Sequence, residues 1–195
     1  MASISDFLDP MVVTVTSPDG NVSARVTNSL AVDIAFRPGT YERYDEPRLS
    51  HQLARLGVAG FVGLQRGRSE AYRRSRDLSA DELADAERPS TDPRRQSYEE
   101  ELRQLRAEGV SGSGAVRIRT VGMTHWEVAL RPGSLRRLDE RAFVAELDAA
   151  LRALLNDRDV KVIIVKSDHF DLGLPKHWLV EMRRLRDINE ARSGR

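Results

Sequence analysis

The sequence predicts an α+β protein made of two similar units, each a three-stranded antiparallel β-meander followed by a long helix. The first observation is an internal repeat: Arg37–Glu46 (RPGTYERYDE) returns 94 residues later as Arg131–Glu140 (RPGSLRRLDE). The second is that alternating apolar residues precede each copy and a helical apolar stripe follows it. One chain is therefore expected to build the architecture of a dimer, which we call a pseudo-dimer.

The repeat extends beyond this motif in both directions, over about forty positions. The further identical pairs at the same spacing are Gly20/Gly114, Val22/Val116, Arg25/Arg119, Ala35/Ala129, Leu53/Leu147 and Ala59/Ala153. The similarity is lost after about Leu155. A fixed spacing over this length indicates one supersecondary unit used twice.

Three short alternating segments predict the strands of the first unit. Val12–Thr16 is rich in β-branched residues, and the turn signal Ser17–Gly20 (SPDG) connects it to a second strand over Val22–Val26. A third strand over Leu30–Phe36 follows and ends at Pro38-Gly39. The sequence thus begins, after a lead in its first ten residues that is expected to be disordered, with a meander.

A long helix is predicted to begin after Asp45, a capping residue with Pro47 in the first turn behind it. Apolar residues at near-helical spacing carry this helix to about Arg76. Each glycine inside an isolated helix costs about 1 kcal/mol relative to alanine. Four glycines spaced by three or four residues therefore predict that another backbone approaches this helix closely, as part of tight packing against a partner surface: Gly57, Gly60, Gly63 and Gly67.

The segment between the units reads as a linker with its own helices. Ser79 is expected to cap a short helix, and Arg94–Glu108 predicts an exposed one. Gly109–Gly114 (GVSGSG) is interpreted as a flexible joint. The predicted organisation is a first unit over residues 1–78, a helical linker over 79–109 and a second unit over 110–195.

The second unit is expected to follow the plan of the first and then to diverge. Strands are predicted around Val116–Val121 and Trp126–Leu130, and a helix capped by Asp139 follows. Asn156–Asp159 is interpreted as a turn. The β-branched run Val160–Val165 (VKVIIV) predicts a strand, with a buried helical segment as the alternative. A final amphipathic helix is predicted over residues 176–191.

The order of these elements resembles the YbaB/EbfC family, and in particular its actinobacterial members. The resemblance is carried by Val13–Val26 and Val32–Leu53 in the first unit, and by Gly114–Gly122 and Val128–Leu151 in the second. It implies a small homodimer associated with DNA or the nucleoid, or, as for some actinobacterial relatives, a chaperone or adaptor of type VII secretion. Two features depart from the family pattern: the long helix before the first unit is missing, and an extra strand-like run and helix end the chain.

The C-terminal half also resembles the beginning of a crotonase. The pattern is carried by Val144–Pro175, where a helix and a strand lead to a loop with Gly173. The remaining twenty or so residues are too few for the usual catalytic carboxylates of such a fold. This resemblance therefore implies a catalytically inactive module.

Composition narrows the function further. Thirty-one Lys and Arg against thirty Asp and Glu give a net charge of +1, without the basic excess of a dedicated nucleic-acid binder. The absence of cysteine excludes disulfides, thiol catalysis and cysteine-ligated zinc. No signal peptide or apolar run long enough for a membrane is visible, so a cytoplasmic protein is expected.

No combination of residues predicts catalysis, a metal or a cofactor. The four histidines, His51, His125, His169 and His177, have no zinc-binding spacing. Asp168–Asp171 (DHFD) is interpreted as a polar loop. No nucleophile, base and orienting group can be assigned to one site. The protein is therefore expected not to be an enzyme.

The candidate binding site is a cluster of arginines near the end of the first long helix: Arg66, Arg68, Arg73, Arg74 and Arg76. On a helix, three of them share a face broadly and could neutralise phosphates of double-stranded DNA. The alternative is a solvated helix tail with Glu70 and Asp77 as local partners. A second basic run is formed by Arg183, Arg184 and Arg186.

Two functional hypotheses follow. The first is a YbaB-like, nucleoid-associated DNA-binding protein. The second is an adaptor or chaperone with a protein client, for which the final helix, with Trp178, Leu179 and Met182 on its apolar face, is a candidate surface. The near-zero net charge favours the second hypothesis, and the family resemblance favours the first.

Overall fold

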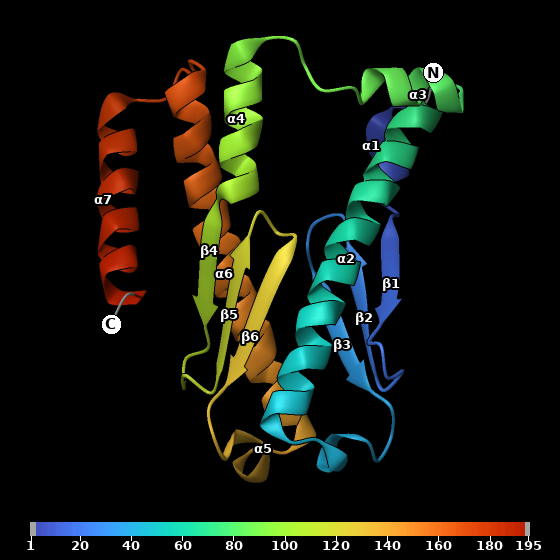
Figure 1. The fold of residues 1–195 in the computed structure, drawn as a ribbon, viewed down its shortest axis with the longest axis vertical. Coiled ribbons are helices and arrows are strands. Elements are labelled where there is room, and N and C mark those ends of the chain that lie inside the picture. Colours follow the sequence, from blue (N-terminus) through green and yellow to red (C-terminus); the bar gives the residue numbers. More distant parts are fainter. Residues whose placement is uncertain (1–2, 194–195) are drawn as a thin grey trace.

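The computed structural model describes residues 3–193 and confirms an α+β fold of two sheet-and-helix units (Figure 1). The two sheets are antiparallel and three-stranded, with the strands in chain order. The strands are β1 (Val12–Thr16), β2 (Val22–Thr27) and β3 (Val32–Phe36) in the first sheet, and β4 (Arg106–Val110), β5 (Val116–Val121) and β6 (His125–Leu130) in the second. A helix of 30 residues follows each sheet: α2 (Glu46–Ser75) and α6 (Glu140–His169).

Shorter elements surround this framework. They are α1 (Ile4–Leu8), the 3-10 helix η1 (Tyr41–Arg43), α3 (Ala80–Ala86), α4 (Pro93–Gln104), α5 (Ser134–Arg137) and α7 (Lys176–Ser193). The capping of α3 by Ser79 is confirmed, because the Ser79 hydroxyl accepts from the Glu82 N–H at 3.3 Å. The expected disordered lead contains α1, in which the Asp6 carboxylate accepts from the Ser3 N–H at 2.7 Å.

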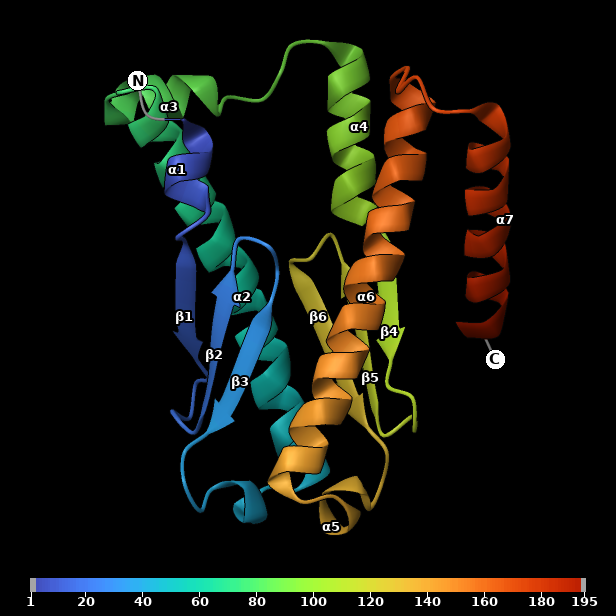
Figure 2. The ribbon, with the colours of Figure 1, turned by 180° about the vertical axis from the view of Figure 1, so that it is seen from behind.

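The two units are related by the same 94-residue spacing over their full length. β1 and β4 start at equivalent positions, as do β2 and β5 and the two long helices. Figures 1 and 2 are views from opposite sides, yet the arrangement looks alike with the two units exchanged. A pseudo-twofold axis therefore runs close to the long axis of the molecule. The sequence similarity ends near Leu155, but the structural similarity continues to His169.

The predicted strand over Val160–Val165 is wrong, and so is the turn over Asn156–Asp159, because both segments lie inside α6. β-Branched residues are only slightly unfavourable in helices, so packing decides their conformation. Here Leu154, Lys161 and Ile164 recur at helical spacing and are buried. The helix-then-strand pattern on which the crotonase resemblance rests is thus one continuous helix.

Strand β4 corrects the interpretation of Arg94–Glu108 as one helix and of Gly109–Gly114 as a flexible joint. Helix α4 ends at Gln104, and β4 begins inside the segment interpreted as linker. Its two inward positions hold Ala107 and Gly109 because α6 lies directly on them. A Cβ at Gly109 would lie 2.1 Å from a carbonyl oxygen of α6 and 2.3 Å from a backbone nitrogen.

The predicted turn of the first unit and the predicted caps of both long helices are confirmed, and the segment interpreted as a joint forms a turn equivalent to the first. The Ser17 hydroxyl accepts from the Val22 N–H at 3.0 Å, and its counterpart Ser111 does the same for Val116 at 3.1 Å. The glycines of the two RPG motifs have φ values of 70° and 77°, a left-handed conformation that favours glycine. Asp45 and Asp139 then accept the N–H groups of Arg48 and Ala142 at 2.8 and 2.7 Å. Each RPG motif therefore marks the exit from a sheet into a capped helix.

Both units share one hydrophobic core. Helix α2 packs on β1 and β2 but also on β6 of the other unit, and α6 packs on β4 and β5 but also on β3. Buried residues of both units form one cluster, among them Leu49, Leu53, Phe143 and Leu147. The Tyr41 hydroxyl also donates to the Leu138 carbonyl at 2.9 Å. The pseudo-dimer is thus one packed body.

The close packing predicted for the α2 glycines is confirmed at three of the four positions. A Cβ would lie 2.5 Å from Trp126 at Gly57, 2.5 Å from Val13 at Gly63 and 2.5 Å from the sulfur of Met11 at Gly67. At Gly60 the nearest atom would be 3.6 Å away, an ordinary contact. The close neighbours are side chains of β1 and β6 and of Met11 just before β1, and not the backbone predicted from the sequence.

Candidate functional site

The predicted arginine cluster lies at the end of α2 that projects past the first sheet towards α1 and α3 (Figure 1). Arg68 is held by the turn between β2 and β3. Its Nε donates to Asn28 Oδ1 and its Nη2 to the Asn28 carbonyl, both at 3.2 Å. Because this guanidinium joins the helix to the sheet, Arg68 is a structural residue of the first unit.

Arg73 and Arg74 share one carboxylate, that of Glu70. Arg73 donates to its two oxygens at 2.7 and 2.8 Å and also to the Leu78 carbonyl at 3.0 Å. Arg74 donates to Glu70 at 2.7 Å. These hydrogen bonds lower the pKa of Glu70 to about 2, so its negative charge is present throughout the physiological pH range. The local partner expected for a solvated helix tail is therefore in place.

Arg66 and Arg76 are the two members of the cluster most available to a ligand. Both are exposed, and Arg76 lies over the ring of Tyr72 with 6.0 Å between its Cζ and the ring centroid. Arg74 keeps 58% of its side chain exposed despite its ion pair. Two exposed guanidiniums, with a third partly neutralised, are therefore what the cluster presents to a negatively charged ligand.

The second basic run lies on α7 and is paired with neighbouring carboxylates. Arg183 donates to Asp168, at the end of α6, and Arg186 to Asp187 at 2.9 Å. Arg184 lies 3.9 Å from a carboxylate oxygen of Glu181. These pairs leave little net positive charge along the helix.

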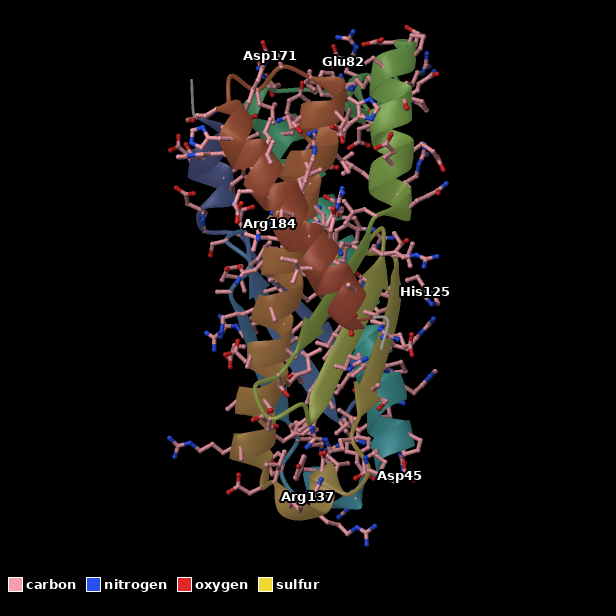
Figure 3. The ribbon with its side chains drawn as sticks, turned by 90° about the vertical axis from the view of Figure 1, so that its left-hand side faces the viewer. Asp45, Glu82, His125, Arg137, Asp171 and Arg184 are labelled. Carbon is pink, nitrogen blue, oxygen red and sulfur yellow. The ribbon has the colours of Figure 1, made fainter. Side chains whose placement is uncertain are left out.

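Helix α7 instead presents large apolar side chains to solvent. In Figure 3 it is the nearest element, with Arg184 on it, and it packs on α6. Leu179 and Met182 are half-buried on its inner side. Four residues on the same helix are exposed by 57, 63, 50 and 45%: Trp178, Val180, Leu185 and Ile188. The apolar face predicted for this helix is thus divided, with Trp178 on the solvent side.

A groove separates α7 from the second sheet. It has a volume of about 1250 Å³ and lies between β4 and β5, α6 and α7. An ion pair of α6, Asp157 with Lys161 at 3.0 Å, borders it. Asp157 accepts from the Glu108 N–H at 2.9 Å, and the Lys161 ammonium donates to the Arg106 carbonyl at 3.0 Å. This ion pair therefore satisfies backbone groups at the outer edge of β4.

An apolar cavity of about 90 Å³ lies where the two units meet. Residues of both sheets and both long helices line it, including Ile34, Phe61, Trp126, Val128 and Leu151. Its lining is almost entirely apolar, so it offers no polar group to orient a substrate.

His169 and Asp171 of the DHFD segment make contacts within the fold. His169 is the last residue of α6, lies 3.0 Å from Glu101 Oε1 and packs edge-on against Tyr98. Asp171 accepts from the Gly173 N–H at 2.9 Å. Among residues 3–193, no three His, Asp or Glu side chains are placed to hold a metal ion. Nor does any helix of this range have the length and apolar character to cross a membrane.

No protein-family model, curated protein or solved structure matches this chain. The YbaB/EbfC resemblance therefore stays a prediction, and the functional argument depends on the geometry described above.

Proposed function

We propose that this protein is a non-enzymatic adaptor that binds another polypeptide through α7. The observation that carries the proposal is the exposure of Trp178, Val180, Leu185 and Ile188 on one helix. Complete burial of a large apolar side chain contributes about 1.5–3 kcal/mol of favourable free energy. Residues that are already half-buried contribute a fraction of this on binding, which suits reversible binding of a partner.

The surroundings of these residues support the same function. Charged side chains lie among and beside them: Arg184 is 3.9 Å from a carboxylate oxygen of Glu181, and Arg186 pairs with Asp187 at 2.8 Å. Protein interfaces likewise combine aromatic and apolar residues with polar and charged ones. Duplex DNA, in contrast, requires a continuous positive surface.

Site-specific photocrosslinking tests the proposal in the native host. A photoreactive amino acid at Val180 is expected to give a discrete protein adduct, and one at exposed Ala35 on the first sheet is the matched control. Introducing L185D and I188D together should abolish the adduct while far-UV circular dichroism stays unchanged. Equal crosslinking at both positions, or an adduct that survives these substitutions, contradicts the proposal.

DNA binding is the second candidate, favoured by the exposed Arg66 and Arg76 and by the partly exposed Arg74 at one end of α2. This is also the function that the YbaB/EbfC resemblance implies. Each contacted phosphate contributes about −0.9 to the slope of log K against log salt. If Arg66 and Arg76 each contact one phosphate, replacing both by alanine should make this slope shallower by about 1.8.

Fluorescence anisotropy with a duplex over a salt series measures this slope. The control is Arg95→Ala with Arg103→Ala, which removes two exposed arginines of α4. No binding at about 50 mM salt, or an equal effect of both double variants, rules out the cluster as a DNA site.

A further inference from the structure

The two outer sheet edges, at β1 and β4, differ in a way that the repeat does not predict. In β4 the N–H and C=O groups of Arg106, Glu108 and Val110 point away from β5, since the alternate residues pair with it. Asp157 and Lys161 of α6 bond two of these groups. Two of the six outward backbone groups of β4 are therefore bonded by side chains of its own unit, which partly closes this edge.

Among the described residues, no side chain is bonded to the equivalent edge of β1. Ser17 donates its N–H to the Val22 carbonyl, and this pairing directs the backbone groups of Val12, Thr14 and Thr16 away from β2. The α2 positions equivalent to Asp157 and Lys161 hold Gly63 and Gly67, which have no side chain to bond them. In Figures 1 and 2 no element lies beside β1 on its outer side, and α1 and α3 lie above its end.

We propose that two copies of this chain associate through β1, in antiparallel orientation about Thr14, and join their first sheets into one six-stranded sheet. The strand sequence VVTVT suits this pairing. Thr14 of one copy lies opposite Thr14 of the other, and Val12 lies opposite Thr16 at either end. Threonine pairs directly opposite each other are favourable across strands.

The uncharged character of β1 points to a second copy as the occupant. None of its five residues carries a charge, so two copies meet without repulsion, whereas a charged peptide finds no complementary group. The partly closed β4 edge also limits growth: with one open outer edge on each copy, the pairing ends at a closed twofold dimer and forms no fibre.

This interface is independent of the proposed client surface. In Figure 1, β1 lies at the right margin and α7 at the left margin, and the ribbon seen from behind in Figure 2 gives the same separation. A dimer through β1 thus leaves α7 of both copies accessible. It would present two client sites on one assembly.

Sedimentation velocity of the full chain over a concentration series tests the proposal. The native chain is expected to form a dimer, and Thr14→Lys and Thr14→Glu should each sediment as monomers at concentrations where it is dimeric. In a dimer of either variant, two like charges would face each other at the twofold axis and repel. An equimolar mixture of the two variants should restore the dimer, because lysine then faces glutamate.

Ala35→Lys is the matched control, since it adds the same charge at an exposed position on the same sheet but away from β1. It should remain dimeric, and circular dichroism should be the same for all variants because the Thr14 side chain is exposed. A native chain that is monomeric at every concentration overturns the proposal. A dimer that persists in both Thr14 variants, or a mixture that stays monomeric, overturns it as well. Crosslinking at Val180 is unaffected by these outcomes.

Discussion

Gly57 of α2 lies against the indole ring of Trp126 in β6, so close that a Cβ would be 2.5 Å from a ring carbon. The indole N–H donates to the Met123 carbonyl at 2.7 Å, which fixes the ring. The equivalent positions of the other unit hold Leu151 and Val32. The first contact thus pairs a small helix residue with a large strand residue. At the equivalent contact the helix residue is large and the strand residue is smaller.

This contact predicts opposite effects for two neighbouring glycines. Gly57→Ala is expected to lower the free energy of unfolding by about 1–3 kcal/mol, because the fixed indole must move. Gly60→Ala should raise it by up to about 1 kcal/mol through helix propensity, since its nearest neighbour is at an ordinary distance. Urea denaturation measures both. Equal changes would contradict the packing described for α2.

The contact between β4 and α6 predicts a larger effect. Gly109→Ala should destabilise the protein by about 3 kcal/mol or more, because the added methyl group meets helix backbone that cannot turn away. Gly112→Ala is the control, since a Cβ there meets no atom within 4 Å. Thermal unfolding of the two variants should differ clearly. A mild effect at Gly109 would mean that α6 lies farther from the strand.

Two buried tyrosines predict a loss of stability at high pH. Burial raises the pKa of Tyr41 to about 12, helped by the negative charge of Asp139. Burial and a hydrogen bond to Asp19, at 2.6 Å, raise the pKa of Tyr44 to about 12 as well. Because folding raises both values, this stability is complete below about pH 10 and is lost as the pH rises towards 12.

Tyrosinate absorbance during an alkaline titration checks this expectation. Two of the four tyrosines should ionise late in the folded protein, and all should ionise together in denaturant. The late signal should be reduced in Tyr41→Phe and in Tyr44→Phe. Four tyrosines ionising together in the folded protein would contradict the burial of these rings.

At low pH, Glu146 predicts a different dependence. Hydrogen bonds from Ser111 and Ser113, at 2.6 Å for Ser113, lower the pKa of its carboxyl. A carboxyl whose pKa is lowered by folding stabilises the folded protein above the pKa of the unfolded chain, about 4.3. This stabilisation is lost as the pH falls through the pKa in the folded state. The first unit has Gln52 at this position, where it accepts from the Asp19 N–H at 3.2 Å.

Glu146→Gln should therefore keep the hydrogen bond and remove the titration. We expect stability close to that of the native protein at pH 7 and a shallower loss below about pH 4.5. Chemical denaturation at several pH values measures both. An unchanged acid dependence would assign it to other carboxylates, such as Asp19, whose pKa is also lowered.

The strands of the first unit, its turn and the helix caps could be predicted from the sequence because they depend on neighbouring residues. Ser17 and Asp45, for example, accept hydrogen bonds from N–H groups three to five residues away. β4 was not predictable in the same way. Its inward alanine and glycine are set by the backbone of α6, more than forty residues away, and leave no apolar alternation to read.

Similar reasons apply to the candidate site. Pairing of Arg73 and Arg74 with Glu70 follows from helical spacing and could be anticipated. The bond of Arg68 to Asn28 joins residues 40 positions apart and required the fold. In α6, the β-branched run concealed the helix, although the length of α2 at the same spacing already indicated where α6 ends.

The ion pair of Asp157 and Lys161 also has an evolutionary consequence. When two identical chains assemble, any substitution appears on both sides of the axis, so both edges are closed or both stay open. Covalent fusion of the two copies removes this restriction, because Gly63 and Gly67 can persist in one while the other acquires charges. A chain of two fused units can therefore differ between its two ends, with one edge bonded by its own side chains and the other not, which a symmetric dimer of identical chains cannot encode.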